Sequence, residues 1–186
     1  MFFLNNFEVK KMDLKKYIRS IPDYPKKGIL FRDITTLIKD KEAFKESIEQ
    51  LSKILNELEY DKIAAIESRG FIFATPLSYN LSKPVILMRK KNKLPAEKLS
   101  VDFELEYGKA TLEMHKDSVS KKEKIIIVDD LIATGGTAEA AAKLVEKSGG
   151  EVSGFIFIIN LFDLGGKEML EKKGYKTFSL MEFPGH

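Results

Sequence analysis

Hydrophobic residues follow two different spacings along the chain. Between Phe44 and Leu58 they recur every three or four positions, which predicts an amphipathic helix. The runs Ile125–Val128 and Phe155–Ile159 contain no polar residue, and such runs predict strands that are covered on both faces. The chain therefore contains the two element types of a layered fold.

The remaining segments extend this alternation of strands and helices. Residues Phe103–Tyr107 alternate between apolar and acidic side chains and, with Ala110–Met114, predict a β-hairpin across Gly108. Further strands are expected at Ile63–Ile66, Pro84–Met88, Val152–Ile159 and Tyr175–Leu180, and further helices at Leu14–Arg19, after Gly70, from Thr137 to about Lys147 and from about Lys167 to Lys173. Two prolines and a glycine in residues 21–28 predict an ordered loop. The pattern favours an α/β fold with a mostly parallel sheet flanked by helices, whose ligands bind beyond the carboxyl ends of the strands.

Length and internal organisation indicate one domain. The 186 residues contain no long linker, repeat or low-complexity tract. Met12 opens a more conventional beginning than Met1, so residues 1–11 are interpreted as an extension without a role and residues 12–186 as a single domain.

The composition argues against several classes of protein. There is no cysteine, which excludes a disulfide framework and thiol catalysis and fits a reducing, cytoplasmic location. The 31 basic and 28 acidic residues give a charge of only +3, too mild to argue for nucleic acid. The longest apolar run is far shorter than a membrane span, and residues 1–6 lack the features of a signal peptide.

The segment Asp129–Thr137 carries the clearest chemical signal. It joins a buried strand to a helix through a loop with two glycines, Gly135 and Gly136, which we expect to adopt positive φ and bring amides close to an anion. The helix adds the positive end of its dipole, and Thr134 and Thr137 add hydroxyl donors.

Asp129 and Asp130 would repel a phosphate, so the two carboxylates are expected to accept hydrogen bonds from ribose hydroxyls or to act as outer partners of a magnesium ion. A sugar phosphate thus suits both halves of the segment. The alternative is a plain glycine-rich turn with Asp130 on the surface. The segment is neither a Walker loop nor a dinucleotide fingerprint.

Ile125–Thr137 resembles the signature of type I phosphoribosyltransferases, which bind 5-phosphoribosyl-1-diphosphate. The resemblance runs from about Ile21 to Lys173 and implies a small N-terminal hood, a flexible β-hairpin lid, Mg²⁺ as cofactor and a homodimer. It also implies that Asp129, Asp130, Ala133, Thr134, Gly135, Gly136 and Thr137 bind the ribose and its phosphate.

The choice of base depends on Ala133. Members of the family that use 6-oxopurines usually have an aspartate here, whereas this window resembles the adenine-specific members. By the same resemblance, Leu30, Phe31 and Arg32 bind adenine, with backbone groups pairing to the base edge. The alternative for this segment is that Phe31 and Ile34 belong to the core and that Arg32 forms a local ion pair with Asp33.

Two further segments are assigned to the diphosphate by resemblance. The diphosphate-binding residues implied are Glu67, Ser68, Arg69, Gly70, Arg89, Lys90 and Lys93. A strand followed by a helix start with an arginine suits a diphosphate. The alternatives are a helix-capping serine with a solvated arginine and, for residues 89–93, a solvated basic turn.

The hairpin resembles the family's lid, and the match assigns an acid/base role to Glu106, with Arg69 as the second catalytic residue. His115 and His186 fit no motif and are interpreted as surface residues, and nothing is assigned to Met181–His186.

The sequence therefore predicts an enzyme of purine salvage that converts adenine and 5-phosphoribosyl-1-diphosphate to AMP and diphosphate. Two rival interpretations remain. One is a regulator that senses the same sugar diphosphate and binds nucleic acid, although 186 residues leave little room for an appended DNA-binding module. The other is a transferase for another base.

Overall fold

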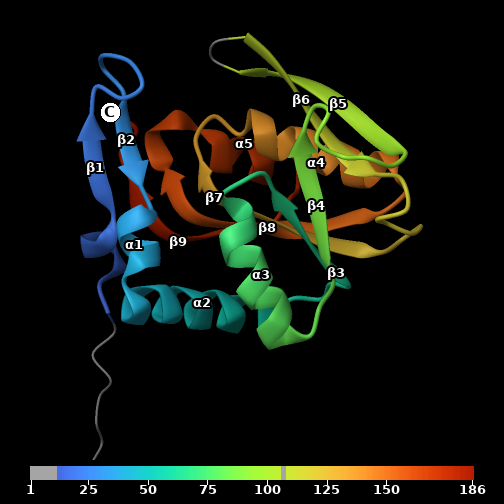
Figure 1. Cartoon of the computed structure of the whole chain (residues 1–186), viewed down its shortest axis with the longest axis horizontal. Helices are drawn as coiled ribbons and strands as arrows, with labels where there is room; N and C mark the ends of the chain where they lie inside the picture. The colour runs from blue at the N-terminus through green and yellow to red at the C-terminus, as the bar shows by residue number, and fades with distance from the viewer. Residues whose placement is uncertain (1–11, 106–107) are drawn as a thin grey trace, which may run out of the picture.

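A mixed seven-stranded sheet with the order β5-β6-β4-β3-β7-β8-β9 forms the centre of the computed structural model, which describes residues 12–105 and 108–186 (Figure 1). The strands are β3 (Lys62–Ile66), β4 (Val85–Lys90), β5 (Lys98–Leu105), β6 (Gly108–His115), β7 (Lys124–Ile132), β8 (Glu151–Leu161) and β9 (Thr177–Phe183). The neighbours from β4 to β9 pair in parallel, whereas β5, β6 and β4 pair antiparallel. The predicted α/β class, the mostly parallel sheet and the hairpin are confirmed.

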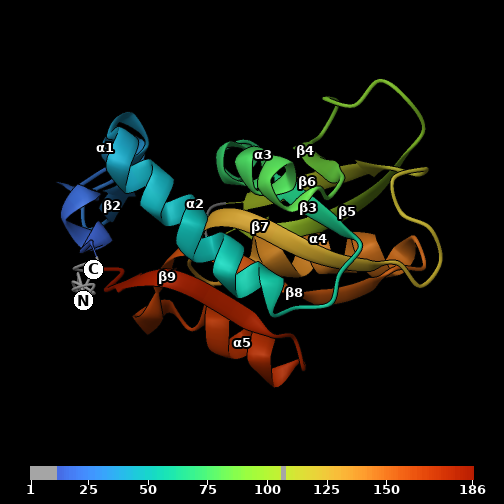
Figure 2. The ribbon, with the colours of Figure 1, turned by 90° about the horizontal axis from the view of Figure 1, so that it is seen from below.

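Helices cover both faces of the sheet. The helices are α1 (Thr35–Lys39), α2 (Lys41–Asn56), α3 (Gly70–Leu81), α4 (Gly136–Lys147) and α5 (Gly166–Lys172), with short 3₁₀ turns η1 (Leu14–Tyr17) and η2 (Phe162–Leu164). One hydrophobic core lies under α2 and α3, and a second lies under α4 and α5. Figure 2 shows α5 on the side of β9 that faces away from α2. None of the described helices is long and apolar enough to cross a membrane.

Strand β7 shows why an uninterrupted apolar run is needed at the centre. Successive side chains of a strand point to opposite faces. Ile126 and Val128 join the core beneath α2 and α3, while Ile125 and Ile127 join the core beneath α4 and α5. All four are completely buried, so each of these four positions must be apolar.

A small hood precedes the sheet in the chain. It consists of η1 and the two-stranded antiparallel sheet of β1 (Arg19–Pro22) and β2 (Leu30–Asp33), and α1 connects it to α2. The predicted loop over residues 21–28 is therefore wrong at its start, because Ile21 and Pro22 pair with β2. Proline is tolerated there because β1 is an edge strand.

Two glycines let separate segments reach the end of β7. A Cβ on Gly70, at the start of α3, would lie 2.7 Å from the Val128 carbonyl oxygen. A Cβ on Gly166, at the start of α5, would lie 2.3 Å from the Ala133 carbonyl oxygen, which accepts a hydrogen bond from the Gly166 amide at 3.0 Å. Backbone therefore packs directly on backbone on both sides of β7.

The first prediction concerns Gly166→Ala. Alanine favours a helix over glycine by about 1 kcal/mol, so helix propensity alone predicts stabilisation. The Cβ would instead overlap the Ala133 carbonyl, and we expect the free energy of unfolding to fall by about 1–3 kcal/mol, the usual effect of overpacking. Denaturant titration measures this difference.

The matched control is Lys172→Ala, an exposed position on the same helix. Its unfolding free energy should stay within about 0.5 kcal/mol of the parent. A Gly166→Ala protein as stable as this control would contradict the close packing.

Candidate active site

A cleft of two connected lobes opens at the carboxyl ends of the parallel strands. The loop lobe has a volume of about 460 Å³ and is lined by residues 129–138, by residues 29–32 of the hood and by Gly185 and His186. The hairpin lobe has a volume of about 960 Å³ and is lined by residues 66–69, Lys90, Lys91 and the β5–β6 hairpin. Both lobes are lined by Phe31, Arg69, Asp129, Asp130 and Thr137. These five residues therefore mark the junction.

The predicted phosphate segment lines the loop lobe along its whole length. Strand β7 continues to Ile132, so the aspartates stand on a strand, and the predicted loop shortens to residues 133–135. Gly135 has φ +89° and precedes α4, as expected. The expectation of positive φ at Gly136 is wrong: a Cβ there would lie 3.0 Å from the Glu104 carbonyl oxygen, so this glycine permits close approach of β5.

Asp129 and Asp130 lie side by side at the junction. Asp130 is only 3% exposed, which excludes the alternative that it is a surface residue. Its backbone amide donates to Asp129 Oδ1 at 2.9 Å, and Arg69 Nε lies 3.0 Å from Asp130 Oδ2. Asp130 Oδ2 accepts no hydrogen bond from a described residue, so the contact with Arg69 is an ion pair only.

Burial sets the protonation of this pair. It raises the pKa of Asp129 well above the ordinary value, and the neighbouring Asp130 carboxylate raises it further. Burial also raises the pKa of Asp130, although Arg69 opposes the effect. The folded chain therefore holds two carboxylates in a place that favours their neutral forms.

The same pair is the place to test for a magnesium site. Among the described residues, no three His, Cys, Asp or Glu side chains form a group that could hold a metal ion. Mg²⁺ in proteins commonly keeps several waters and uses one or two carboxylates together with substrate oxygens. Asp129, Asp130 and the buried, unbonded Oδ2 atom fit that mode of binding.

The hairpin lobe gathers part of the predicted diphosphate set. Glu67, Ser68, Arg69 and Lys90 line it, and so does Lys91; Gly70, Arg89 and Lys93 do not. The Glu67 carboxylate accepts from Arg89 Nη2 at 3.1 Å and from the Lys90 amide at 2.9 Å. Burial opposes ionisation of Glu67, but these bonds lower its pKa. The Glu67–Ser68 peptide bond is cis.

Arg89 is thus turned away from the lobe. Its Nη1 donates to the Lys93 carbonyl at 3.1 Å, so the guanidinium joins the Glu67 loop to the end of the basic turn. The carboxylate of Glu113, 3% exposed on β6, accepts from the Asn92 amide at 2.9 Å and lies 3.4 Å from Lys98 Nζ. Asn92 has φ +64°. Sequence reasoning missed Glu113, because no local pattern marks a carboxylate that supports a distant turn.

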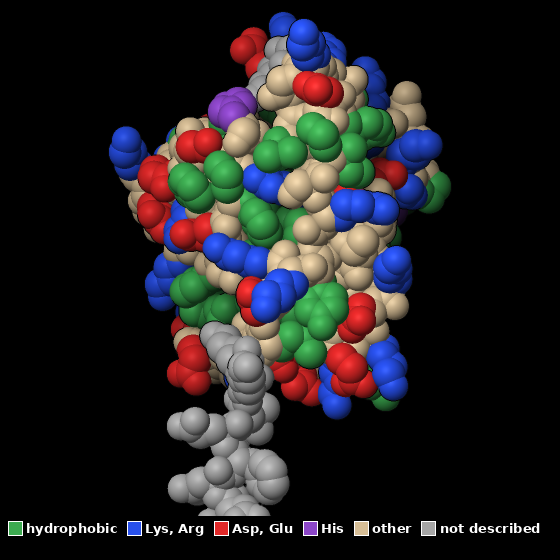
Figure 3. All heavy atoms as spheres, turned by 90° about the vertical axis from the view of Figure 1, so that its left-hand side faces the viewer, with side chains coloured by type: hydrophobic (Ala, Val, Ile, Leu, Met, Phe, Trp, Pro, Cys, Tyr) green, Lys and Arg blue, Asp and Glu red, His purple; other side chains and the backbone are tan. Residues whose placement is uncertain are grey.

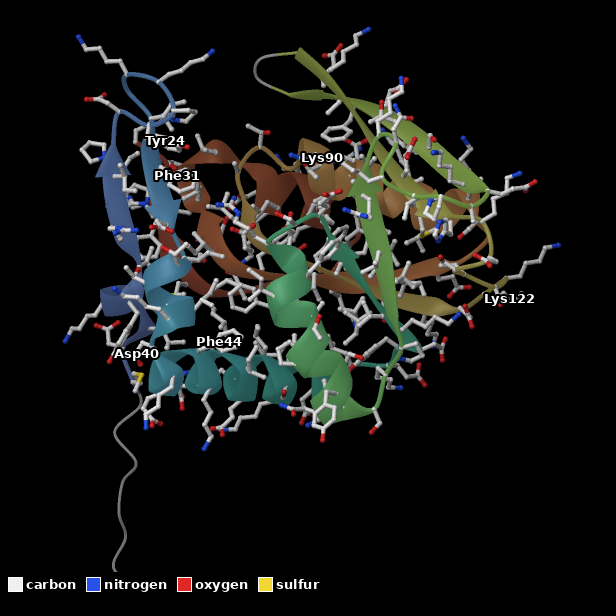
Figure 4. All side chains as sticks on the ribbon, in the orientation of Figure 1. Tyr24, Phe31, Asp40, Phe44, Lys90 and Lys122 are labelled. Carbon is white, nitrogen blue, oxygen red and sulfur yellow. The ribbon has the colours of Figure 1, made fainter. Side chains whose placement is uncertain are left out.

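The hood supplies the third part of the cleft. Leu30, Phe31 and Arg32 all line the loop lobe. The Phe31 ring stands 5.4 Å from the Arg69 guanidinium carbon, and the Tyr24 ring meets it edge-on. Figure 4 shows Phe31 on β2 and Lys90 on β4 on opposite sides of the cleft. Phe31 is therefore a wall of the cleft rather than a core residue.

The alternative of an Arg32–Asp33 ion pair is wrong. Asp33 accepts from Arg19 Nε at 2.9 Å and from the Thr35 amide at 2.8 Å. Arg32 instead donates to Ser20 Oγ and, at 2.8 Å, to the carbonyl of Pro184.

Of the two histidines, only His186 lines the cleft. Its interpretation as a surface residue without a site is therefore incomplete, and the end of the chain, to which nothing was assigned, reaches the loop lobe at Gly185 and His186. The His115 ring accepts a bond from the Ala96 amide at 3.4 Å and does not line either lobe. Glu106, to which an acid/base role was assigned, lies outside the described residues.

Comparison with known proteins gives both a family model and close relatives. A family model described as a phosphoribosyl transferase domain matches residues 35–184. An adenine phosphoribosyltransferase from Pelagibacter ubique is 68% identical over 94% of this chain and 100% of its own length. Its counterpart from Lachnoclostridium phytofermentans is 51% identical, over 92% of this chain and 98% of that protein.

Comparison with solved structures finds the same kind of enzyme. The adenine phosphoribosyltransferase from Thermoanaerobacter pseudethanolicus superposes with a TM-score of 0.88 at 52% identity, covering 91% of this chain and 98% of that one. The enzyme from Saccharomyces cerevisiae, solved with D-2,5-dideoxy-2,5-imino-altritol 1,6-bisphosphate and adenine, gives 0.83 at 34% identity, covering 90% and 96%. The chain belongs to the adenine phosphoribosyltransferases of the type I phosphoribosyltransferase family.

Proposed function

We propose that the two-lobed cleft carries out this family's reaction, in which N9 of adenine displaces diphosphate from C1 of 5-phosphoribosyl-1-diphosphate to give AMP. The observation that carries the proposal is the junction of the lobes at Arg69, Asp129 and Asp130. A sugar held there would direct its 5-phosphate into the loop lobe and its diphosphate into the hairpin lobe.

The sugar phosphate is assigned to the residues at the end of β7. The amides of residues 134–137, the hydroxyls of Thr134 and Thr137 and the start of α4 would hold the 5-phosphate. The carboxylates of Asp129 and Asp130 would accept the ribose hydroxyls. Because these groups stand on a central strand, they would hold the sugar in one orientation for attack.

The diphosphate is assigned to Arg69, Lys90 and Lys91 in the hairpin lobe. Glu67 and Arg89 would support this site by fixing the backbone of Lys90, and Lys93 adds positive charge beside them. Gly70 would serve by letting the start of α3 approach β7. A magnesium ion bound through substrate oxygens would neutralise part of the charge that develops on the leaving diphosphate.

The base is assigned to the hood end of the loop lobe. The yeast relative was solved with adenine, and the lobe here combines the backbone of Leu30–Arg32 with the Phe31 ring and apolar side chains such as Leu131 and Leu164. Ala133 borders the same space without a charge. The β5–β6 hairpin would close over the site and exclude water, and Glu106 is proposed to move protons near N7 or N9.

We propose that the enzyme works as a homodimer through α3. Ile72 and Tyr79 form one exposed stripe of this helix, 36% and 86% exposed, and Leu87 of β4 is 44% exposed. Large exposed apolar side chains close together in space are typical of an interface. The helix begins immediately after Arg69, so such an interface would support the diphosphate site from behind.

A nucleic-acid-binding regulator is less well supported. On the hood-side face in Figure 3, Lys and Arg side chains are interspersed with Asp and Glu, and the described residues of that face form no continuous basic patch. Nucleic acid binding requires such a patch.

The second prediction tests the aspartates. In Asp129→Asn/Asp130→Asn, we expect the KM for the sugar diphosphate to rise at least about tenfold and kcat to fall, since a hydrogen bond to a charged group contributes roughly 1.5–3 kcal/mol. Steady-state kinetics measure both constants, and the exposed Asp117→Asn is the control. Unchanged kinetics would remove the pair from the site.

Thermal unfolding separates this effect from misfolding. The pKa of Asp129 in the folded chain lies above its ordinary 3.8, so the folded state holds the proton more strongly than the unfolded state, and ionisation on raising the pH above about 4 destabilises the fold. At neutral pH the double variant should therefore melt no lower than the parent. A lower Tm would attribute the kinetic loss to the fold.

The third prediction concerns the base. Diphosphate release, measured with adenine, hypoxanthine, guanine, xanthine and orotate in turn, should be fastest with adenine. Ala133→Asp should lower kcat/KM for adenine at least about tenfold, because it would place an unpaired carboxylate in the lining of the lobe that is assigned to the base. Ala133→Ser is the control for size. Equal kcat/KM in the two variants would exclude a charge effect at this position.

The fourth prediction concerns assembly. Sedimentation equilibrium should give a mass of twice 21.1 kDa for the parent. Tyr79→Asp should weaken the dimer by at least about fivefold, since an aromatic anchor in an interface typically contributes more than about 1 kcal/mol. Tyr24→Asp, at an aromatic residue 54% exposed in the hood, should leave the mass unchanged. A monomeric parent would exclude the dimer.

A further inference from the structure

The segment Phe183–His186 crosses the base end of the loop lobe between the hood and the sheet. Gly185 and His186 line the lobe together with Leu30–Arg32 of the hood and Leu164 of η2. Figure 1 shows the end of the chain beside β1 and β2. No part of the reaction described above uses this segment.

The hood holds the segment through Arg32. This side chain is 6% exposed, and its Nη2 donates to the Pro184 carbonyl at 2.8 Å. Its guanidinium carbon also lies 4.7 Å from the centre of the Phe183 ring. Burial lowers the pKa of Arg32, and the Asp163 carboxylate opposes that effect. Both terminal nitrogens of the guanidinium are thus engaged, by Ser20 and by Pro184, whereas the buried Nε has no hydrogen-bond partner among the described residues. We therefore assign the contact with the base to the Arg32 backbone.

The sheet side holds the segment through η2. The Gly185 amide donates to Asp163 Oδ1 at 2.6 Å. A Cβ on Gly185 would lie 2.8 Å from Leu164 Cγ, so the segment has no room for a side chain at this point. Leu164 itself lines the loop lobe, and the segment therefore packs directly behind a pocket wall.

We propose that Phe183–His186 forms the outer wall of the base pocket, anchored by Arg32 on one side and by Asp163 on the other, and that it sets the affinity of the enzyme for the purine base. Arg32 and Asp163 then act as positioning residues. The inference rests on the proposed placement of adenine against Leu30–Arg32.

The wall should affect the two substrates differently. The base is assigned to the hood end of the loop lobe, which the segment closes. The 5-phosphate of the sugar is instead assigned to residues 134–137 at the start of α4, and the diphosphate to the hairpin lobe, which the segment does not line. Loosening the wall should thus weaken the binding of adenine and leave that of the sugar diphosphate intact. A general loss of structure would change both constants.

Asp163→Ala and Gly185→Val test this in the full chain. The first removes one anchor, and the second inserts a side chain against Leu164. We expect each to raise the KM for adenine about threefold to tenfold, the scale of one lost hydrogen bond, while the KM for the sugar diphosphate changes by less than about twofold. Phe162→Ala is the matched control, since this neighbour in η2 is 49% exposed and does not line the lobe.

Phe31→Ala, measured in parallel, separates the inference from the function on which it rests. If Phe31→Ala raises the KM for adenine and the two wall variants do not, the wall is overturned and the base placement stands. If none of the three changes that KM, the base placement fails as well. A parallel rise of both Michaelis constants in the wall variants would also overturn the proposal, because it would indicate a general structural role.

Discussion

The structure depends on one constraint, the enclosure of two adjacent carboxylates, one buried and one partly buried, at the end of a central strand. Asp129 and Asp130 are enclosed because other segments pack closely around the end of β7. Gly70 brings the start of α3 onto the Val128 carbonyl, and this places Arg69 within 3.0 Å of Asp130. Gly166 brings the start of α5 onto Ala133 in the same way. The absence of two side chains thus allows the polar end of β7 to be enclosed.

Two enclosed carboxylates lower the stability of the fold, but they suit a reaction whose transition state carries positive charge on the sugar. Burial and mutual repulsion raise the pKa of Asp129, so the surroundings do not stabilise the charged pair. A sugar that gains positive charge as diphosphate leaves would be stabilised by these carboxylates, which the surrounding segments hold in place. The enclosed carboxylates therefore both destabilise the fold and provide the proposed catalytic effect. Such a trade-off between stability and activity is common in enzymes.

Much of the fold and of the lining of the loop lobe could be predicted because their signals are local. The apolar run of β7, the glycine before α4 and Ala133 all lie within one short segment. The extension of β7 to Ile132 was missed because aspartates in a sequence resemble loop residues, and only tertiary neighbours bury them. The Glu67–Arg89 bond and the support of Asn92 by Glu113 join residues more than twenty positions apart, and no spacing rule reveals them.

The contacts of Arg32 could be predicted only in part from neighbouring residues. Successive side chains on β2 point to opposite faces, so a pair with Asp33 could have been rejected once a strand was recognised. The actual partner, the Pro184 carbonyl, is 152 residues away and could not have been inferred. In the structure Arg32 lines the loop lobe, and its side chain holds the segment that ends the chain. A movement of the hood relative to the sheet would therefore displace the proposed base contacts and the proposed wall together, so the position of the hood determines the shape of the pocket.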